Sequence, residues 1–268
     1  MTIPGLQGSR LKPLSIFFSL ALASCIFLVL LSIVTYPPVD QLVDAACSEE
    51  IIFSVRLSLI TATVSTAVCI LVSIPSAYAL SRYDVPGKNL VNTLINIPMA
   101  LPPLVAGVGL LILLGLSPLG QGITSVSGIE FVFAPAGIVV AQCFMNAPYL
   151  MRIMRSTFDS VSPRYEHVAK SLGCTDLQAF LRVTLPMSTS GLLAGTVITW
   201  SKAIGEFGAV LIIAGATRYR TEILPTSVFL NMSCGELDMA IAAASVMILI
   251  SVASLYAFEK FGNKVNVY

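Results

Sequence analysis

Long runs without a charged residue alternate with short polar segments along the chain. Residues 13–39, 57–81, 131–151 and 239–258 are such runs. A helix of about 20 apolar residues crosses the hydrocarbon core of a bilayer. The runs are continuously apolar and do not alternate, which excludes the strands of a membrane β-barrel. The pattern predicts that each run forms one membrane-spanning helix.

Two further apolar stretches are less regular. Residues 89–129 carry no charge but are too long for one span, and the turn-rich residues 117–122 are expected to end the third helix. The fifth span is expected from about residue 188 to 216, with Lys202 and Glu206 inside it. The chain is therefore predicted to be an all-α integral membrane protein with six transmembrane helices.

The composition agrees with a chain embedded in lipid. Of the 268 residues, 56% are hydrophobic and only 11% are charged, and the mean hydropathy is +0.89. A soluble domain carries roughly 25% charged residues, so this chain has too few to cover a surface facing water. The net charge of +1 gives no reason to expect a nucleic-acid partner.

Lysine and arginine are unevenly divided between the two sides of the predicted bundle. Cytoplasmic loops of membrane proteins are enriched in these residues. If the N-terminus is cytoplasmic, the inner segments hold Arg10, Lys12, Arg82, Lys88, Arg152, Arg155, Arg164, Lys170, Arg182, Lys260 and Lys264, and the outer segments hold Arg56, Arg218 and Arg220. This asymmetry places both termini in the cytoplasm. The expected organisation is a cytoplasmic N-terminus (1–12), a single transmembrane domain (13–258) with a cytoplasmic loop at about 152–187, and a cytoplasmic tail (259–268).

Motifs for ATP binding, hydrolysis and metal chemistry are missing from the sequence. There is no G-x-x-x-x-G-K-[ST] loop, no H-E-x-x-H and no G-x-S-x-G, and His167 is the only histidine. No pair of cysteines has metal-site spacing. Cys47 and Cys234 both fall in outer segments. The sequence leaves two alternatives for them, a disulfide or two free thiols. The chain is predicted to be a transporter without a catalytic residue, a metal or a cofactor.

One polar stretch lies between two apolar spans on the predicted cytoplasmic side. Ser162 and Pro163 suit the N-cap and the first position of a helix, and Gly173 suits its end. Thr175 and Gln178 match a capping box that begins a second short helix. The pattern predicts two short helices joined at a glycine.

The second short helix has an apolar face made by Leu177, Phe180 and Leu181. Residues 183–186 are expected to end it and to turn the chain back toward the membrane. Short amphipathic helices lie at a membrane surface or dock in a groove of a partner protein. The residues alone leave both options open.

The same stretch resembles the EAA signature of ABC-importer permeases, although His167 and Val168 depart from the small residues usual after the glutamate. The matching positions, in order, are Glu166, Ala169, Leu172, Gly173, Phe180, Val183, Leu185 and Pro186. In that family the segment forms coupling helices that sit in a cleft of a cytoplasmic ATPase subunit. The resemblance assigns ATPase coupling to Glu166, Ala169, Leu172, Gly173, Phe180, Leu185 and Pro186.

The resemblance covers about residues 50–258. Residues 76–82 look like the end of the family's next helix, and residues 101–107 (Leu-Pro-Pro-Leu-Val-Ala-Gly) resemble the oxyanion branch. Residues 201–209 are similar to a run of molybdate and sulfate permeases. The molybdate/tungstate branch is the more similar, and sulfate stays open. The first helix looks like an addition that the shortest permeases lack.

This resemblance implies the type I ABC importer permease fold and a multi-pass location in the cell (plasma) membrane. It also implies a homodimer of permease subunits, two cytoplasmic ATP-binding subunits and an extracytoplasmic oxyanion-binding protein. The expected function is import of molybdate or tungstate by alternating access, with sulfate or thiosulfate as the alternative. A stand-alone secondary transporter or channel, which needs no ATPase, is the remaining alternative.

Lys202 and Glu206 stand four residues apart in the fifth span, on one face of the expected helix. Charges at bilayer depth are costly and face a bundle interior or a wet cavity. Either the two neutralise each other and lock helices together, or they line the path or gate of an anion. Thr196, Thr199 and Ser201 offer hydroxyls to the same path, or they bond to their own helix.

Prolines interrupt or begin the third span. Pro102 and Pro103, together with Pro98, remove backbone donors, which a membrane tolerates only where other groups satisfy the freed carbonyls. A kink beside the translocation path and simple helix-start geometry are both open, and Pro102 and Pro103 are kept as path candidates. Arg218 and Arg220 follow the fifth span, where they attract an anion or a delivering protein, or are solvated loop charges.

Overall fold

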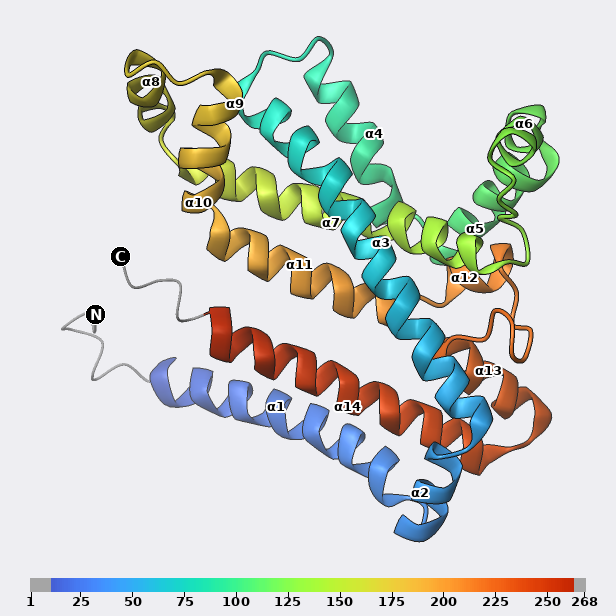
Figure 1. Ribbon diagram of the computed structural model, residues 1–268. Coiled ribbons are helices and arrows are strands. Elements are labelled where there is room, and N and C mark those ends of the chain that lie inside the picture. Colours follow the sequence, from blue (N-terminus) through green and yellow to red (C-terminus); the bar gives the residue numbers. More distant parts are fainter. Residues whose placement is uncertain (1–10, 263–268) are drawn as a thin grey trace.

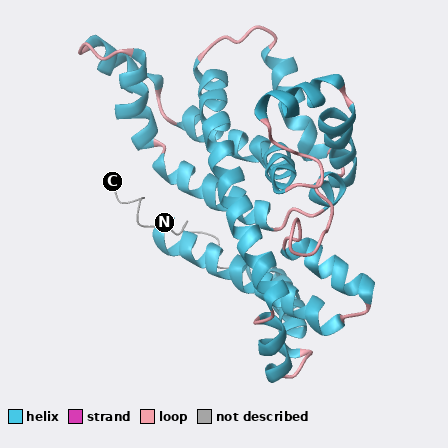
Figure 2. Ribbon diagram, turned by 45° about the vertical axis from the view of Figure 1, so that its right-hand side comes forward, coloured by secondary structure: helices cyan, strands magenta, loops and turns pink. Residues whose placement is uncertain are grey.

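The computed structural model describes the backbone of residues 11–262 and the side chains of residues 11–256. All regular structure in this part of the chain is helical, which confirms the all-α expectation (Figures 1 and 2). Residues 1–10 and 263–268 lie outside the described residues, and with them most of the expected N-terminal segment and part of the expected tail.

The helices include several short pieces between the long ones, and η1 and η2 are π-helical turns. In chain order they are α1 (Leu11–Thr35), α2 (Val39–Ala46), α3 (Glu49–Arg82), α4 (Lys88–Ala100), α5 (Pro103–Leu111), η1 (Ile112–Leu116), α6 (Pro118–Ser127), α7 (Pro135–Ser160), α8 (Pro163–Ser171), α9 (Asp176–Ala179), η2 (Phe180–Thr184), α10 (Leu185–Met187), α11 (Thr189–Ile204), α12 (Gly208–Ile213), α13 (Leu224–Cys234) and α14 (Leu237–Gly262).

Among the described helices, α1, α3 and the part of α14 up to Tyr256 are each long and apolar enough to cross a membrane. They lie where the first, second and sixth spans are expected. However, α3 already begins at Glu49, well before the charge-free run. Ser48 caps this start, because its side-chain oxygen accepts a hydrogen bond from the N–H of Ile51.

Helix α7 coincides with the fourth expected span, but its expected end at residue 151 is wrong. The helix continues to Ser160. Arg152 interrupts the apolar run on the exposed side, while Met154 and Phe158 remain fully buried on the other side. A charge therefore ends the apolar run here without ending the helix.

The third expected span is not one helix. The chain bends by 111° between α4 and the continuous α5–η1 segment. Leu101 takes an extended conformation with ψ of 140°, as residues before proline do, and Pro102 has no N–H to continue α4. The segment ends at Leu116 as expected, but residues 118–122 belong to α6 and are not a turn.

The fifth expected span is also broken. Helix α11 ends at Ile204 and α12 begins at Gly208, so Glu206 lies in the gap between them. The side-chain Nε2 of Gln142 on α7 donates to the carbonyl oxygen of Ala203 at 2.8 Å. This bond satisfies a carbonyl at the end of α11 and allows the helix to stop inside the bundle. The expectation that Lys202 and Glu206 share one helix face is therefore wrong.

Apolar clusters hold the bundle together, and two of them include α7. One joins α5, α7 and α12 around Ala106, Ile138 and Val210. The other joins α3 and α7 around Leu150 and Phe158. Helix α1, by contrast, has no buried residue and lies alongside α14 (Figure 1).

Several helix ends gather on one side of the molecule, at the left of Figure 1. They are the start of α1 and the ends of α3, α7 and α14, and α8–α10 lie beside them. Helices α2 and α13 lie on the opposite side. Cys47 and Cys234, near that opposite side, are exposed free thiols and are not paired.

Candidate coupling hairpin and translocation path

Residues 163–187 form a helical hairpin that projects from the bundle, at the upper left of Figure 1. Helix α8 begins after Ser162 as expected, although the Ser162 side chain makes no capping bond. Gly173 follows the end of α8 with φ of +95°, a conformation that favours glycine. Thr175 and Gln178 form the expected capping box at the start of α9.

The second helix of the hairpin does not end at residues 183–186, contrary to expectation. It continues through the π-turn η2 into α10, which ends at Met187. Pro186 lies near the end of this continuous helix, where its ring removes one backbone donor. The N–H of Ser188 then donates to the carbonyls of Thr184 and Leu185 and joins α10 to α11.

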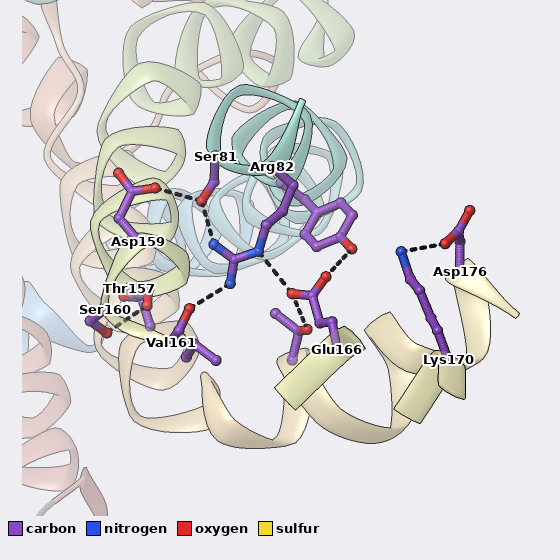
Figure 3. A network of polar contacts seen from close by, with 11 residues as sticks. Ser81, Arg82, Thr157, Asp159, Ser160, Val161, Glu166, Lys170 and Asp176 are labelled. Atoms are coloured by element: carbon purple, nitrogen blue, oxygen red, sulfur yellow. Dashed lines mark hydrogen bonds and ion pairs between the residues drawn. The ribbon is translucent and has the colours of Figure 1, made fainter. Parts of the chain in front are cut away.

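Glu166 is buried at the base of the hairpin (Figure 3). Its carboxylate accepts hydrogen bonds from Arg82 Nε at 2.8 Å, Tyr78 Oη at 2.9 Å and Thr184 Oγ1 at 2.7 Å. Burial acts to raise the pKa of Glu166, but the hydrogen bonds from these three side chains and the charge of Arg82 outweigh it and lower the pKa below its ordinary value. The charged carboxylate thus fastens α8 to the end of α3 and to η2.

Arg82 extends this polar network to the end of α7 (Figure 3). Its Nη2 donates to the carbonyl oxygen of Val161 at 2.7 Å, and its Nη1 donates to Ser81 Oγ at 3.1 Å. Ser81 in turn donates to Asp159. The side chains of Arg82 and Glu166 are only 8% and 5% exposed, so the two form a buried ion pair.

An aromatic cluster packs beside the ion pair. The ring centroid of Phe180 lies 4.6 Å from that of Tyr78 and 6.1 Å from that of Phe158. The rings of Tyr78 and Phe158 are themselves 5.8 Å apart. The turn η2 therefore packs against both α3 and α7, and the hairpin is held by apolar as well as polar contacts.

The residues that the sequence assigns to coupling divide between two faces of the hairpin. The buried or half-buried members are Glu166, Ala169, Phe180 and Leu185, and the exposed members are Leu172, Gly173 and Pro186. Large exposed apolar side chains form what we call the outer hairpin face: Val168, Leu172, Leu177 and Leu181. One set holds the hairpin to the bundle, and the other leaves an apolar surface uncovered.

The two helix breaks meet inside the bundle. A Cβ atom on Gly208, the first residue of α12, would lie 2.9 Å from Cβ of Pro103. A Cβ atom on Gly107 of α5 would lie 2.9 Å from the carbonyl oxygen of Ala209. Glycine at both positions permits this close approach of α5 and α12. Pro102 and Pro103 are thereby placed next to the break that holds Glu206.

Lys202 and Glu206 do not form an ion pair, the first of the two alternatives that the sequence left open. The Nζ of Lys202 lies 4.2 Å from the ring centroid of Tyr149 on α7. Within the described part of the chain, Lys202 makes no ion pair. The Oε1 of Glu206 is buried, and no group in the same part of the chain hydrogen-bonds to it.

The candidate hydroxyls on α11 behave differently from one another. The Oγ1 of Thr199 is buried and has no hydrogen-bond partner among the described residues. Ser201 Oγ shares a hydrogen bond of 2.9 Å with Ser254 Oγ on α14. Ser201 therefore bonds across helices and not to its own helix. The part that either plays in a path stays a prediction.

Sequence reasoning missed the partners that hold these sites in place. Tyr78 and Arg82 lie in a motif that the sequence identifies only as a helix end. Gln142 and Asn146 are buried amides inside an apolar run; Gln142 donates to the Ala203 carbonyl, whereas the side chain of Asn146 has no hydrogen-bond partner among the described residues. A polar side chain in such a run needs a partner or a wet cavity, and that is the signal by which they can be found.

Two spans are broken inside the bundle, and the outer hairpin face is exposed outside it. These features are typical of a helical transporter subunit. The family described as the binding-protein-dependent transport system inner membrane component matches residues 69–266, and the chain belongs to this family. It is the permease component of an ABC transporter, a multi-pass protein of the inner membrane, and is not itself catalytic. By family, such permeases work with ATPase subunits and a periplasmic binding protein.

The relatives are permeases of named transport systems. The chain is 35% identical over 215 residues to a probable molybdenum ABC transporter permease of Haloferax volcanii, covering 80% of this chain and 77% of the relative. It is 30% identical over 226 residues to the sulfate transport system permease CysT of Salmonella typhimurium, covering 83% and 82%. It is 35% identical over 176 residues to the molybdate/tungstate transport system permease WtpB of Thermococcus kodakarensis, covering 66% of each.

Solved structures show the same fold. A bacterial ABC transporter involved in the import of the acidic polysaccharide alginate has a TM-score of 0.74 at 16% identity, covering 96% of this chain and 94% of that chain. The MetNI methionine ABC transporter, in an inward-facing conformation, has a TM-score of 0.61 at 15% identity, covering 82% and 99%. The chain therefore has the permease fold of ABC importers.

Proposed function

We propose that this chain is the transmembrane permease of an ATP-driven importer for a tetrahedral oxyanion, molybdate or tungstate first. Relatives at 35% identity are named for molybdenum and for molybdate/tungstate, and one at 30% is named for sulfate. The run at residues 201–209, which resembles those permeases, covers the end of α11 and the break before α12. These similarities support the oxyanion class.

The observation that carries the ATP-driven part is the hairpin. Its outer face leaves Leu172 81% exposed, and an apolar helical face of this kind fits a groove on a partner protein. Its inner face is fixed to α3 and α7 through Arg82 and Glu166. Breaking a buried ion pair by removing one partner costs about 3–5 kcal/mol, so movement of the hairpin carries the ends of these helices with it.

In this proposal the ATPase subunit seats on the outer hairpin face, in the cytoplasm. The coupling residues are Glu166, Ala169, Leu172, Gly173, Phe180, Leu185 and Pro186. The exposed ones, Leu172, Gly173 and Pro186, contact the ATPase, and the buried or half-buried ones transmit its movement. The chain has both termini in the cytoplasm, with segments 1–12, 13–258 and 259–268 and a coupling loop at about 152–187. Its spans are α1, α3, α4 with α5, α7, α11 with α12, and α14.

Alternating access requires an element with two discrete arrangements. The junction of α5 and α12 suits this role, because neither helix is continuous with the one before it. We assign the path or gate to Pro102, Pro103, Thr199, Ser201, Lys202 and Glu206. Two copies of the permease flank one central path, two ATPase subunits drive it, and an oxyanion-binding protein delivers the anion from outside.

Competition in proteoliposomes tests the substrate. The vesicles contain the permease with its ATPase subunit, and the binding protein is added outside with labelled molybdate. We expect tungstate to displace molybdate at a lower concentration than sulfate or thiosulfate does. The reverse order would make the chain a sulfate permease. Uptake that follows an ion gradient without ATP would make it a secondary transporter.

A further inference from the structure

A cavity of about 620 Å³ with both apolar and polar lining residues lies between α4 and α7. Its polar lining consists of Asn92 and Asn96 from α4, and Arg152 and Arg155 from α7. A second cavity of about 390 Å³ borders α4 and is also lined by Asn92 and Asn96. None of these four residues belongs to the coupling set or to the assigned gate.

The two arginines have different surroundings. Arg155 Nη1 donates to Asn92 Oδ1 at 2.7 Å, and Arg155 Nε lies 3.8 Å from Asp159 Oδ2. Arg152 is exposed, and in the described part of the chain it makes no hydrogen bond or ion pair. The cavity therefore holds one uncompensated guanidinium and one that a carboxylate partly neutralises.

The position of Arg152 along α7 places its charge away from the helix end. Arg152 precedes the end of α7 at Ser160 by about 12 Å of helix rise. Arg152 directly follows the expected fourth span, and a cation at such a border faces a water-filled cavity or extends to the headgroups. Arg152 lines a cavity whose opposite wall carries amides, so the wet cavity is the environment that the fold provides.

We propose that Arg152, Arg155, Asn92 and Asn96 form a transient binding site for the transported tetrahedral dianion in the cytoplasmic half of its path. The inference rests on the proposed function and names a subsite within it. The planar guanidinium fork matches two oxygens of a tetrahedral oxyanion. The Nδ2 of Asn92 has no partner among the described residues and adds a donor, since only its Oδ1 is taken by Arg155.

The site continues a line of cations that begins at the gate. Tyr149, which contacts Lys202 at 4.2 Å, precedes Arg152 by about one turn of α7. Lys202, Arg152 and Arg155 therefore follow one another from the helix break toward the hairpin end of α7. A conducted ion must be bound firmly enough to enter and weakly enough to leave. Asp159 weakens the last cation, which favours release.

Uptake per ATP hydrolysed, in the reconstituted complex, tests the site. Arg152→Gln removes the uncompensated charge, and Lys88→Gln is the matched control, because Lys88 begins the same α4 but does not line the cavity. We expect Arg152→Gln to lower uptake of molybdate or sulfate by roughly tenfold or more, the effect of one charge-assisted hydrogen bond. Lys88→Gln should remain near wild type. Equal uptake per ATP in the two variants overturns the proposal.

A second readout does not depend on the arginine variants folding. In Asn96→Cys, the rate at which a thiosulfonate reagent modifies position 96 is followed by mass spectrometry of the peptide, which separates it from the native cysteines. Molybdate or sulfate should slow this modification, and chloride at the same ionic strength should not. Equal rates with and without oxyanion overturn the proposal.

Phospholipid headgroups share the phosphate chemistry, so vesicle composition distinguishes the two sources. Protection of position 96 by molybdate in vesicles of neutral phosphatidylcholine supports a site for the free anion. An Arg152→Gln defect that appears only with added phosphatidylglycerol identifies a lipid site and overturns the proposal. If the wild-type complex shows no ATP-driven oxyanion uptake, the proposed function itself fails. If the wild-type complex takes up the oxyanion and uptake by Arg152→Gln is unchanged, the proposed binding site is wrong but the proposed function stands.

Discussion

Replacement of Glu166 by glutamine tests how firmly the hairpin is held to the bundle. Glutamine keeps the shape of the side chain and leaves partners for Tyr78 and Thr184, but Arg82 loses its carboxylate. Because the Arg82 and Glu166 side chains are 8% and 5% exposed, water compensates the stranded guanidinium poorly. Removing one partner of a buried pair costs about 3–5 kcal/mol.

Hydrogen exchange of the backbone amides of α8 measures this cost directly. Since about 1.4 kcal/mol corresponds to a factor of ten, the population of detached hairpin should rise roughly hundredfold or more. Amides of α14, which contributes no residue to the network, are the internal control. Unchanged exchange in α8 would refute the reasoning.

The double variant Glu166→Leu with Arg82→Met separates charge from packing. It leaves no buried charge, so the hairpin should open less often than in either single variant. If the double variant opens as often as the sum of both single changes implies, the two side chains do not act as a pair.

Three further predictions concern the turn, the helix junction and acidity. In a thermal unfolding assay, Gly173→Ala should destabilise the hairpin by about 1 kcal/mol. The cost comes from the positive φ alone, because no atom lies within 4 Å of the added Cβ. Gly173→Asn should cost less in the same assay. Gly173→Pro also removes the hydrogen bond from the N–H of residue 173 to the Lys170 carbonyl and so disturbs the turn of the hairpin. ATP hydrolysis should then continue without uptake. Intact ATP-coupled uptake would contradict the coupling assignment. Gly208→Val should lower the free energy of unfolding by about 1–3 kcal/mol through overpacking, because the added Cβ would lie 3.2 Å from the backbone nitrogen of Leu104. An unfolding midpoint equal to that of the wild type would show that α5 and α12 separate freely. Because the folded pKa of Glu166 lies below its unfolded value, its stabilisation is complete above the ordinary glutamate pKa and is lost as the pH falls through the folded value. The opening population of α8, taken from exchange rates corrected for the intrinsic pH dependence of amide exchange, should stay constant near neutral pH and rise only on acidification.

Apolar runs predicted those helices whose sequence is constrained by contact with lipid. α1, α3 and the part of α14 up to Tyr256 are each long and apolar enough to cross a membrane. The same rule placed the end of α7 too early, because the helix continues past Arg152, which lines the cavity between α4 and α7. A charge marks the end of a span only where its side chain has no cavity to face.

Local sequence left a kink at the prolines of the third span as one of two alternatives, and it did not predict the break in the fifth span. Pro102 signals an interruption, but the 111° bend depends on how α5 packs against α12. The end of α11 depends on Gln142, which is far from Ala203 in sequence and reaches its carbonyl across the bundle. For this reason Lys202 and Glu206 do not share one helix face.

Motif order located the hairpin but not the direction of its side chains. The capping box and Gly173 follow from local rules, and both are confirmed. The inward orientation of Glu166 depends on Arg82 and Tyr78, which are 84 and 88 residues away along the chain. Contacts of that separation are set by the fold and cannot be inferred from spacing within one segment.

ATP-dependent uptake with and without the ATPase subunit tests the central claim most directly. The claim is that a partner bound to the outer hairpin face drives transport through this chain. Proteoliposomes with the wild-type permease and its ATPase should take up labelled oxyanion only when ATP is present. Leu172→Asp should abolish uptake and copurification of the ATPase while leaving the unfolding midpoint unchanged. Uptake that persists in vesicles without the ATPase subunit would contradict the account.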